Sequence, residues 1–215
     1  MVDGGRTGVE RGEETLAPFW REWSERAHQR AAPGWVGMIE EMRRLQDAVA
    51  TGVPPAEAVA EVTALLAGAR QVLARHAVGD DEQIYGRLLH VAGRGQTLCP
   101  PLRRVEHTAT ELRGEVVFGA FHSGSNGAVH GGAVTLFFDE ALGRLADLGG
   151  RPRSRTAALN VDFRSVTPVG RPLSVHVRLV EESGRKRRLH AALRDGERLC
   201  AEANGLFVAL RAGQQ

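Results

Sequence analysis

Residues 120–150 of the chain, AFHSGSNGAVHGGAVTLFFDEALGRLADLGG, contain a glycine-rich loop that leads directly into an apolar segment. From Gly132 onward the apolar residues are too continuous for a helix with one face in water, so we expect a helix that other structure surrounds. Gly149 and Gly150 mark its end, as glycines do just beyond a helix C-terminus. Asp139 and Glu140 lie inside this run. Because burying a bare charge is costly, each carboxylate must be paired or used in chemistry.

The start of this helix suits an oxygen that becomes negative during a reaction. Its glycines allow close approach of the backbone, and the first N–H groups of a helix have no intrahelical partner. Gly131 and Asp139 are separated by about 12 Å along a helix, whereas an oxyanion donor and a base should both lie within ~3 Å of one small reacting group. We therefore expect an obligate dimer, in which two antiparallel copies of the helix share each site.

The composition is that of an ordinary soluble globular protein. The 215 residues are 42% hydrophobic and 25% charged, and the net charge of +2 gives no reason to expect nucleic-acid binding. No segment approaches the ~20 apolar residues of a membrane span, and the first residues lack the apolar core of a signal peptide, so we expect a cytoplasmic protein without a membrane partner. Cys99 and Cys200 show neither metal-ligand spacing nor a disulfide framework, and we expect no metal site.

Periodicity divides the chain into three parts. Residues 1–13 are rich in glycine and charge and are expected to be disordered. Residues 14–99 are expected to be helical, and residues 100–215 form the second half, after Pro100 and Pro101. The helices are expected at 16–31, at 35–49, after Pro54-Pro55 and at 82–91. Alternation predicts strands at 104–112 and 114–121, and after the apolar helix at 155–165, 172–181, 187–194 and 198–210. The fold class is α+β.

The second half resembles the hotdog-fold acyl-CoA thioesterases of the phenylacetate-pathway type. The matching residues are Gly127, His130-Gly131-Gly132, Asp139, and the run from Thr156 to Phe163 that leads to Pro168. The resemblance implies a hotdog fold, an antiparallel sheet wrapped around one long central helix, here with an N-terminal all-helical extension. It also implies hydrolysis of an acyl-CoA to free acid and coenzyme A, with no cofactor beyond the coenzyme A of the substrate. The family works as a homodimer or a dimer of dimers with shared active sites.

The resemblance also suggests roles for single residues. Asp139 matches the catalytic carboxylate, which acts as general base or as nucleophile. The N–H groups of Gly131 and Gly132 match the oxyanion donors, and Thr156 matches a threonine that places the attacking water. His130 would hold the loop or contact the carbonyl. Many members carry an asparagine at the position of Gly124, whereas here Asn126 lies two residues later. We assign Asn126 and Gly127 to substrate binding.

Plainer interpretations stand beside these. Asp139 could be a buried carboxylate that the backbone or an arginine caps, Glu140 a structural or interface acid, and His130 a loop-holding residue. Thr156 could be an ordinary strand threonine. Two arginine clusters, at 151–155 and 185–188, suit the phosphates of coenzyme A, and we assign Arg151, Arg153 and Arg187 to substrate binding. Charged hairpin rims can equally serve solubility.

Two other functions compete with thioester hydrolysis. One is a non-catalytic acyl-CoA sensor that signals through its N-terminal helices; a DNA-binding version needs a basic recognition helix, whereas Pro55–Glu61 is acidic. The other is a hotdog hydratase or dehydratase. The sequence leaves open the acyl group, the choice between dimer and tetramer, and whether the N-terminal helices cover the sheet, extend the dimer or roof the acyl tunnel.

Overall fold

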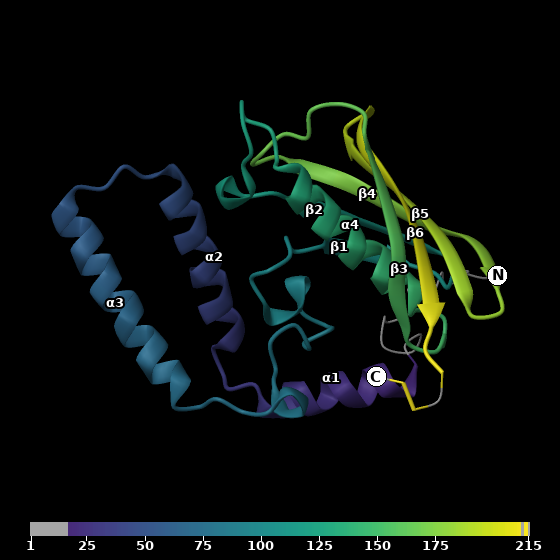
Figure 1. Cartoon of the computed structure of the whole chain (residues 1–215), viewed down its shortest axis with the longest axis horizontal. Coiled ribbons are helices and arrows are strands. Elements are labelled where there is room, and N and C mark those ends of the chain that lie inside the picture. Colours follow the sequence, from purple (N-terminus) through teal and green to yellow (C-terminus); the bar gives the residue numbers. More distant parts are fainter. Residues whose placement is uncertain (1–16, 212, 215) are drawn as a thin grey trace, which may run out of the picture.

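The computed structural model describes residues 17–211, 213 and 214, so the expected disordered segment 1–13 lies outside the described residues. Six antiparallel strands form one sheet in the order β1-β2-β4-β5-β6-β3. The strands are β1 (Arg103–His107), β2 (Glu111–Val117), β3 (Ser154–Phe163), β4 (Pro172–Ser183), β5 (Lys186–Asp195) and β6 (Arg198–Ala209). The sheet curves around one helix, α4 (Gly131–Ala146), as Figure 1 shows. The expected hotdog fold is confirmed.

Helix α4 supplies the centre of the core. It contacts β3, β4, β5 and β6, and Phe137, Phe138, Ala141, Leu142 and Leu145 are all fully buried. Burying a leucine or phenylalanine side chain stabilises a fold by about 1.5–3 kcal/mol, so this one helix contributes much of the hydrophobic stabilisation. The expectation of a surrounded helix, drawn from its continuous apolar pattern, is confirmed.

The strands after α4 follow the predicted alternation. On β5 the buried residues are Arg187, Leu189, Ala191 and Leu193, and their neighbours along the strand face outward. Asp195 pairs with Arg198 across the turn between β5 and β6, and Gly196 there has a φ of 58°, which glycine adopts at little cost. The Asp-Gly hairpin is therefore confirmed.

The boundary predicted between the first two strands is wrong. The break lies at residues 108–110, and Gly114 sits within β2, paired with Val175 of β4. A Cβ atom at Gly114 would come within 2.8 Å of Leu102 and 3.0 Å of the Arg103 carbonyl oxygen. Glycine is thus needed for a close approach between chain segments, not for a turn.

Three helices precede the sheet: α1 (Pro18–Arg30), α2 (Trp35–Thr51) and α3 (Ala56–Ala74). In Figure 1, α1 lies near the C-terminal end of α4, whereas α3 extends away from the sheet. The Asp47 carboxylate ties α2 to the loop before α4 by accepting the Phe121 N–H at 2.9 Å. Helix α3 has no buried residue.

The helix expected at 82–91 does not form. Residues 80–95 instead contain two short 3-10 turns, Asp80–Glu82 and Ala92–Gly95, joined by irregular backbone. Gly86 and Gly93 adopt φ values of 78° and 71°, which are incompatible with an α-helix. Leu88 is 1% exposed, so the apolar residues that suggested a helix instead pack as a folded loop.

Candidate active site

The glycine-rich loop before α4 is a tight hairpin. Asn126 and Gly127 have φ values of 56° and 74°, and the Ala128 N–H donates to the Ser125 carbonyl at 3.1 Å. Two successive positive φ values are the geometry of a two-residue hairpin turn, which Asn-Gly favours. The Val129 N–H donates to the Thr167 carbonyl at 2.8 Å and holds the end of the loop. Asn126 and Gly127 thus lie at an exposed loop tip, where turn geometry by itself accounts for both residue types.

His130 caps the N-terminus of α4. Its Nδ1 accepts a hydrogen bond from the Gly132 N–H at 3.0 Å, which occupies one of the two donors expected to form an oxyanion hole. Within the described part of the chain, nothing accepts a hydrogen bond from the Gly131 N–H. A Cβ atom at Gly131 would lie 3.2 Å from the ring of Phe163, so the backbone approaches this ring closely. The Gly131 N–H therefore remains available to a ligand oxygen.

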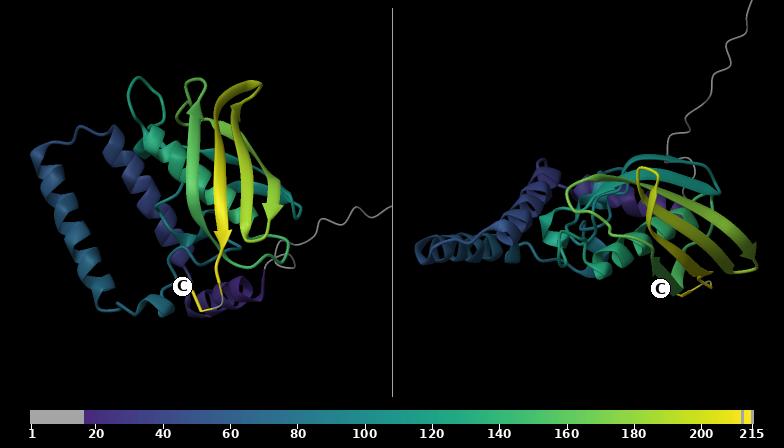
Figure 2. Two further views of the ribbon diagram at one scale, coloured as in Figure 1. Left: turned by 45° about the vertical axis from the view of Figure 1, so that its right-hand side comes forward. Right: turned by 90° about the horizontal axis from the view of Figure 1, so that it is seen from above.

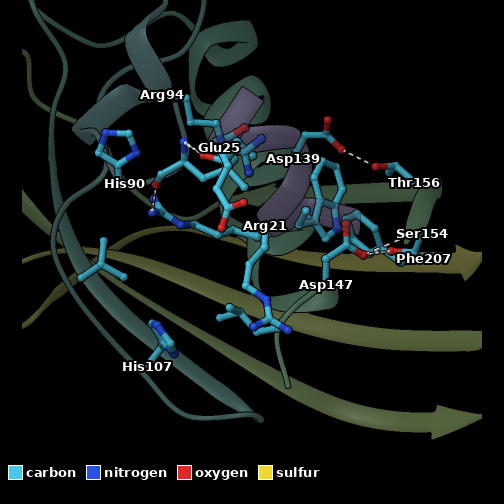
Figure 3. Close-up of a pocket in the computed structure, with 18 of the residues that line it drawn as sticks. Arg21, Glu25, His90, Arg94, His107, Asp139, Asp147, Ser154, Thr156 and Phe207 are labelled. Carbon is cyan, nitrogen blue, oxygen red and sulfur yellow. Dashed lines mark hydrogen bonds and ion pairs between the residues drawn. The ribbon is translucent and has the colours of Figure 1, made fainter. Parts of the chain in front are cut away.

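Asp139 and Thr156 meet across the junction of α4 and β3. The Thr156 hydroxyl donates to Asp139 Oδ1 at 2.8 Å (Figure 3). Asp139 is half-buried although the helix positions beside it, Phe138 and Ala141, are fully buried. The neighbouring Glu140 turns to the other side and forms an ion pair with Arg94, with 2.8 Å between Oε1 and Nε. The two adjacent carboxylates therefore differ, because only Glu140 has an arginine partner.

Asp139 and Thr156 line a cavity of about 1230 Å³. Helix α1, the loop around residues 89–94, α4 and the start of β3 form its walls, and Arg21, Glu25 and His90 are among the lining residues in Figure 3. Gly131 and His130 are not part of this lining. Along α4 the Gly131 backbone is about 12 Å from Asp139. One chain therefore brings the carboxylate and the threonine together but leaves the loop N–H elsewhere.

The arginines assigned to the coenzyme A phosphates make contacts within the chain. Arg151 pairs with Glu182 at 2.9 Å, and Arg153 stacks on the ring of Phe19 at 4.9 Å. Arg187 is 2% exposed and donates to the carbonyls of Ala146 and Pro152. This inward position does not fit the expected phosphate contact of Arg187. The side chain instead holds the C-terminal end of α4 against β5.

Several cavity residues were not anticipated. Arg21 and Glu25 come from α1, Arg94 comes from the irregular loop, and Arg144 lies on α4, one helical turn beyond Glu140. Of these, only Arg144 could have been found from the local sequence, because it lies four residues after Glu140. Arg21, Glu25 and Arg94 reach the cavity through the tertiary structure. Near this wall, burial and then the Glu140 charge raise the pKa of the Cys99 thiol to about 11. No set of three or more potential metal ligands comes together among the residues with defined positions.

Comparison with known proteins agrees with this architecture. Residues 121–208 match a family model described as the acyl-CoA thioesterase N-terminal domain. A thioesterase superfamily protein of known crystal structure superposes with a TM-score of 0.71 and 26% identity, over 83% of this chain and 91% of that one. The chain carries a thioesterase-superfamily domain. Because the superposition covers more of the chain than the sheet and α4, this likeness extends into the N-terminal helices.

Two further proteins are similar to a smaller part of this chain. A Pseudomonas aeruginosa protein named "Putative esterase" is 35% identical over 88 residues, which are 40% of this chain and 66% of that protein. A protein of known structure from Ralstonia eutropha, described as a "putative thioesterase, phenylacetic acid degradation-related protein", is 22% identical with a TM-score of 0.46, over 51% of this chain and 84% of that one. That second likeness is too low to assign the chain to the phenylacetate-pathway type.

Proposed function

We propose that this protein hydrolyses acyl-CoA thioesters to the free acid and coenzyme A, with Asp139 as the catalytic carboxylate. The observation that carries the proposal is the Asp139 side chain itself. It lines a large cavity from a helix whose inner face is fully buried, and its one hydrogen bond to the described chain comes from the Thr156 hydroxyl. A carboxylate held in a cavity without a cationic partner among the described residues is a candidate for chemistry. Membership of the thioesterase superfamily supplies the reaction class.

The hydrogen bond from Thr156 orients Asp139 for work on water. It occupies Oδ1 and leaves Oδ2 to accept a proton from a water molecule. That water oxygen then attacks the thioester carbonyl carbon, the carbonyl oxygen becomes negative, and the Gly131 N–H stabilises it. Collapse of the intermediate breaks the C–S bond and expels the coenzyme A thiolate, which takes up a proton. In the alternative route Asp139 attacks the carbonyl carbon directly and expels the coenzyme A thiolate, which takes up a proton, and water then cleaves the resulting mixed anhydride to the free acid and the Asp139 carboxylate.

The proposed assembly is a homodimer with shared sites. Strand β3 is an edge of the sheet, so its outer backbone groups have no strand partner within the described chain. An exposed edge of this length is a template for pairing with a second copy. Figure 2 shows β3 as the edge nearest to α2 and α3, whose exposed apolar residues would lie beside a copy docked there. A second, antiparallel α4 would bring the partner's Gly131 N–H toward Asp139.

We also propose substrate contacts outside the cavity that Asp139 lines. The exposed loop tip with Asn126 and Gly127, the Gly132 backbone, and Arg151 and Arg153 near the end of α4 are offered as substrate-binding groups. Cys99 and Cys200 are both free thiols, which agrees with the proposal of a reducing, cytoplasmic setting. None of the helices with defined positions is long and apolar enough to cross a membrane.

A panel of acyl-CoA thioesters tests the activity, with release of free thiol as the readout. Asp139→Asn is expected to lower kcat by roughly 10²–10⁴-fold, the usual contribution of a positioned general base. Asp195→Asn is the matched control, because this carboxylate lies at the turn between β5 and β6, outside the cavity lining and away from the β3 edge. Hydrolysis that survives in a correctly folded Asp139→Asn variant would exclude Asp139 as the catalytic group. No turnover of any panel member by the wild type would refute the activity.

Hybrid dimers test the sharing of sites. Gly131 is the first residue of α4, where the proline backbone is allowed and removes the N–H, and His130 before it has the extended ψ of 131° that proline requires. Because a Cβ atom at Gly131 lies 3.2 Å from the Phe163 ring, a thermal melt must first show that Gly131→Pro folds. Gly131→Pro and Asp139→Asn should each be inactive alone. If sites are shared, co-refolded mixtures regain activity, because one site of a hybrid receives both intact groups. Mixtures that stay inactive would place both groups in one chain.

A further inference from the structure

The cavity wall contains a guanidinium without a counter-ion. Arg144 lines the cavity, and its Nη2 donates to the Leu89 carbonyl at 3.3 Å, the one hydrogen bond of this side chain to the described chain. No carboxylate of the described residues forms an ion pair with it, since Glu140 is engaged by Arg94 at 2.8 Å. Burial and then the Arg94 charge lower the pKa of Arg144, against the opposing effect of Glu140. The Arg144 guanidinium has thus lost much of its contact with water, and within the described chain it gains one hydrogen bond and no ion pair in return.

Such an arrangement favours an anionic ligand. A charge taken out of water is costly unless it is paired and hydrogen-bonded, and a guanidinium matches a carboxylate with two parallel hydrogen bonds. The other carboxylates of the cavity are Glu25, Glu106, Asp139 and Asp147, and none of them is among the charges that act on Arg144. Asp147, the nearest of them along the chain, accepts hydrogen bonds from Ser154 and lies 3.6 Å from Arg187. A carboxylate on a ligand inside the cavity would therefore find Arg144 available.

The position of Arg144 relative to Asp139 indicates which part of the substrate it would meet. Asp139 and Arg144 are five residues apart on α4, which is about 7.5 Å along the helix axis and about 140° around it, and both line the same cavity. The cavity therefore extends around α4 from the Asp139 side to the side of Glu140 and Arg144. If the thioester carbonyl reacts at Asp139, an acyl group that follows the cavity toward the C-terminal end of α4 brings its far end to Arg144. Residues of α1 and of the Leu89–Arg94 loop line the cavity there.

We propose that the site prefers acyl groups that end in a carboxylate, with Arg144 as the specificity-determining residue. This inference rests on the proposed thioesterase activity and names its substrate class. The separation of Asp139 and Arg144 along and around α4 fits dicarboxylic acyl groups, in which methylene groups separate the thioester from the free acid. The N-terminal extension contributes residues of α1 to the cavity wall.

The test compares glutaryl-CoA with its monomethyl ester, which has nearly the same shape without the charge. The wild type should hydrolyse the acid with the higher kcat/KM. Arg144→Gln should lower the preference for the acid by about 30-fold or more, as expected for about 2 kcal/mol from one partner of a buried charge pair. Arg144→Lys should keep much of the preference, because it retains the charge. Arg178→Gln, an exposed arginine on β4, should change neither substrate.

The outcomes separate this inference from the proposed function. Equal kcat/KM of the wild type for acid and ester, with good turnover of both, would overturn the inference and leave the thioesterase activity intact. Arg144→Gln that slows both substrates equally would also overturn it, since a structural role changes both alike. No turnover of any acyl-CoA would refute the proposed function and the inference together. A thermal melt of each variant shows that loss of the preference does not reflect unfolding.

Discussion

Replacing Arg187 by methionine should destabilise the fold strongly, because this guanidinium ties three segments together. Its side chain is 2% exposed and donates to Ala146 O at 2.7 Å, to Pro152 O at 2.9 Å and to Glu182 Oε1 at 3.0 Å. Methionine fills similar space but leaves two carbonyls and a carboxylate without their donor. Removing one partner of a buried charged network costs about 3–5 kcal/mol.

For a chain of this size, that loss corresponds to a fall in Tm of roughly 6–20 °C, at about 2–4 °C per kcal/mol. Thermal unfolding followed by circular dichroism, at one protein concentration, measures it. The neighbouring Arg188 provides the control, because its side chain is 59% exposed and its ion pair with Glu181 is at the surface. Arg188→Met should change stability by no more than about 0.5 kcal/mol. If both variants melt together and Arg187→Met instead raises KM, Arg187 contacts substrate and the structural reasoning is wrong.

Three other perturbations follow from single contacts. His130→Ala should lower the free energy of unfolding by about 0.5–2 kcal/mol, because the hydrogen bond that caps the Gly132 N–H is lost. His130→Asn should keep both stability and activity if the residue only holds the loop. Denaturant unfolding measures the stability and thiol release the activity, and an Asn variant that is stable but inactive would show a chemical role. Hydrogen bonds from Arg151 and then Arg187 lower the pKa of Glu182, so its contribution to stability is present above the ordinary carboxyl pKa and is lost as pH falls through the folded value. Glu182→Gln should therefore flatten the decline of Tm on acidification, and parallel wild-type and variant curves would contradict this. Burial raises the pKa of the Cys99 thiol to about 11, so iodoacetamide should label this residue slowly in the native protein and rapidly after unfolding. Mass spectrometry measures the labelling, and fast labelling of the native protein would show that the Cys99 thiol is accessible and reactive.

Local patterns were sufficient to predict the elements around the candidate site. The continuous apolar run predicted that α4 is surrounded, and alternation with the Asp195-Gly196 turn predicted the hairpin of β5 and β6. Both signals arise within a few residues of sequence. The resemblance gave Asp139 and Thr156 separate roles in one reaction, and the 2.8 Å hydrogen bond shows that α4 and β3 bring the two side chains together. Their catalytic roles stay proposals.

Other predictions failed because the local sequence pattern was compatible with more than one structure. The segment 82–91 has enough apolar residues for a helix, yet glycines at positive φ and the burial of Leu88 produce a folded loop. In the run Arg185–Arg188 the alternation of a strand must bury every second residue, but the sequence does not say which. The register of β5 with β4 and β6 turns Arg187 inward and leaves Arg188 in solvent.

The sequence by itself determined the central helix, the glycine-rich loop before it, the succession of strands along the chain and the spacing that separates Gly131 from Asp139. These depend on periodicity and on the backbone freedom of glycine, which act over a few residues. Only the tertiary structure decided that α1 lines the cavity next to Asp139, that Arg94 pairs with Glu140, and that Arg144 has no counter-ion among the described residues. Burial and pairing of a charge depend on segments far apart in the chain, and no local pattern specifies which of them will meet.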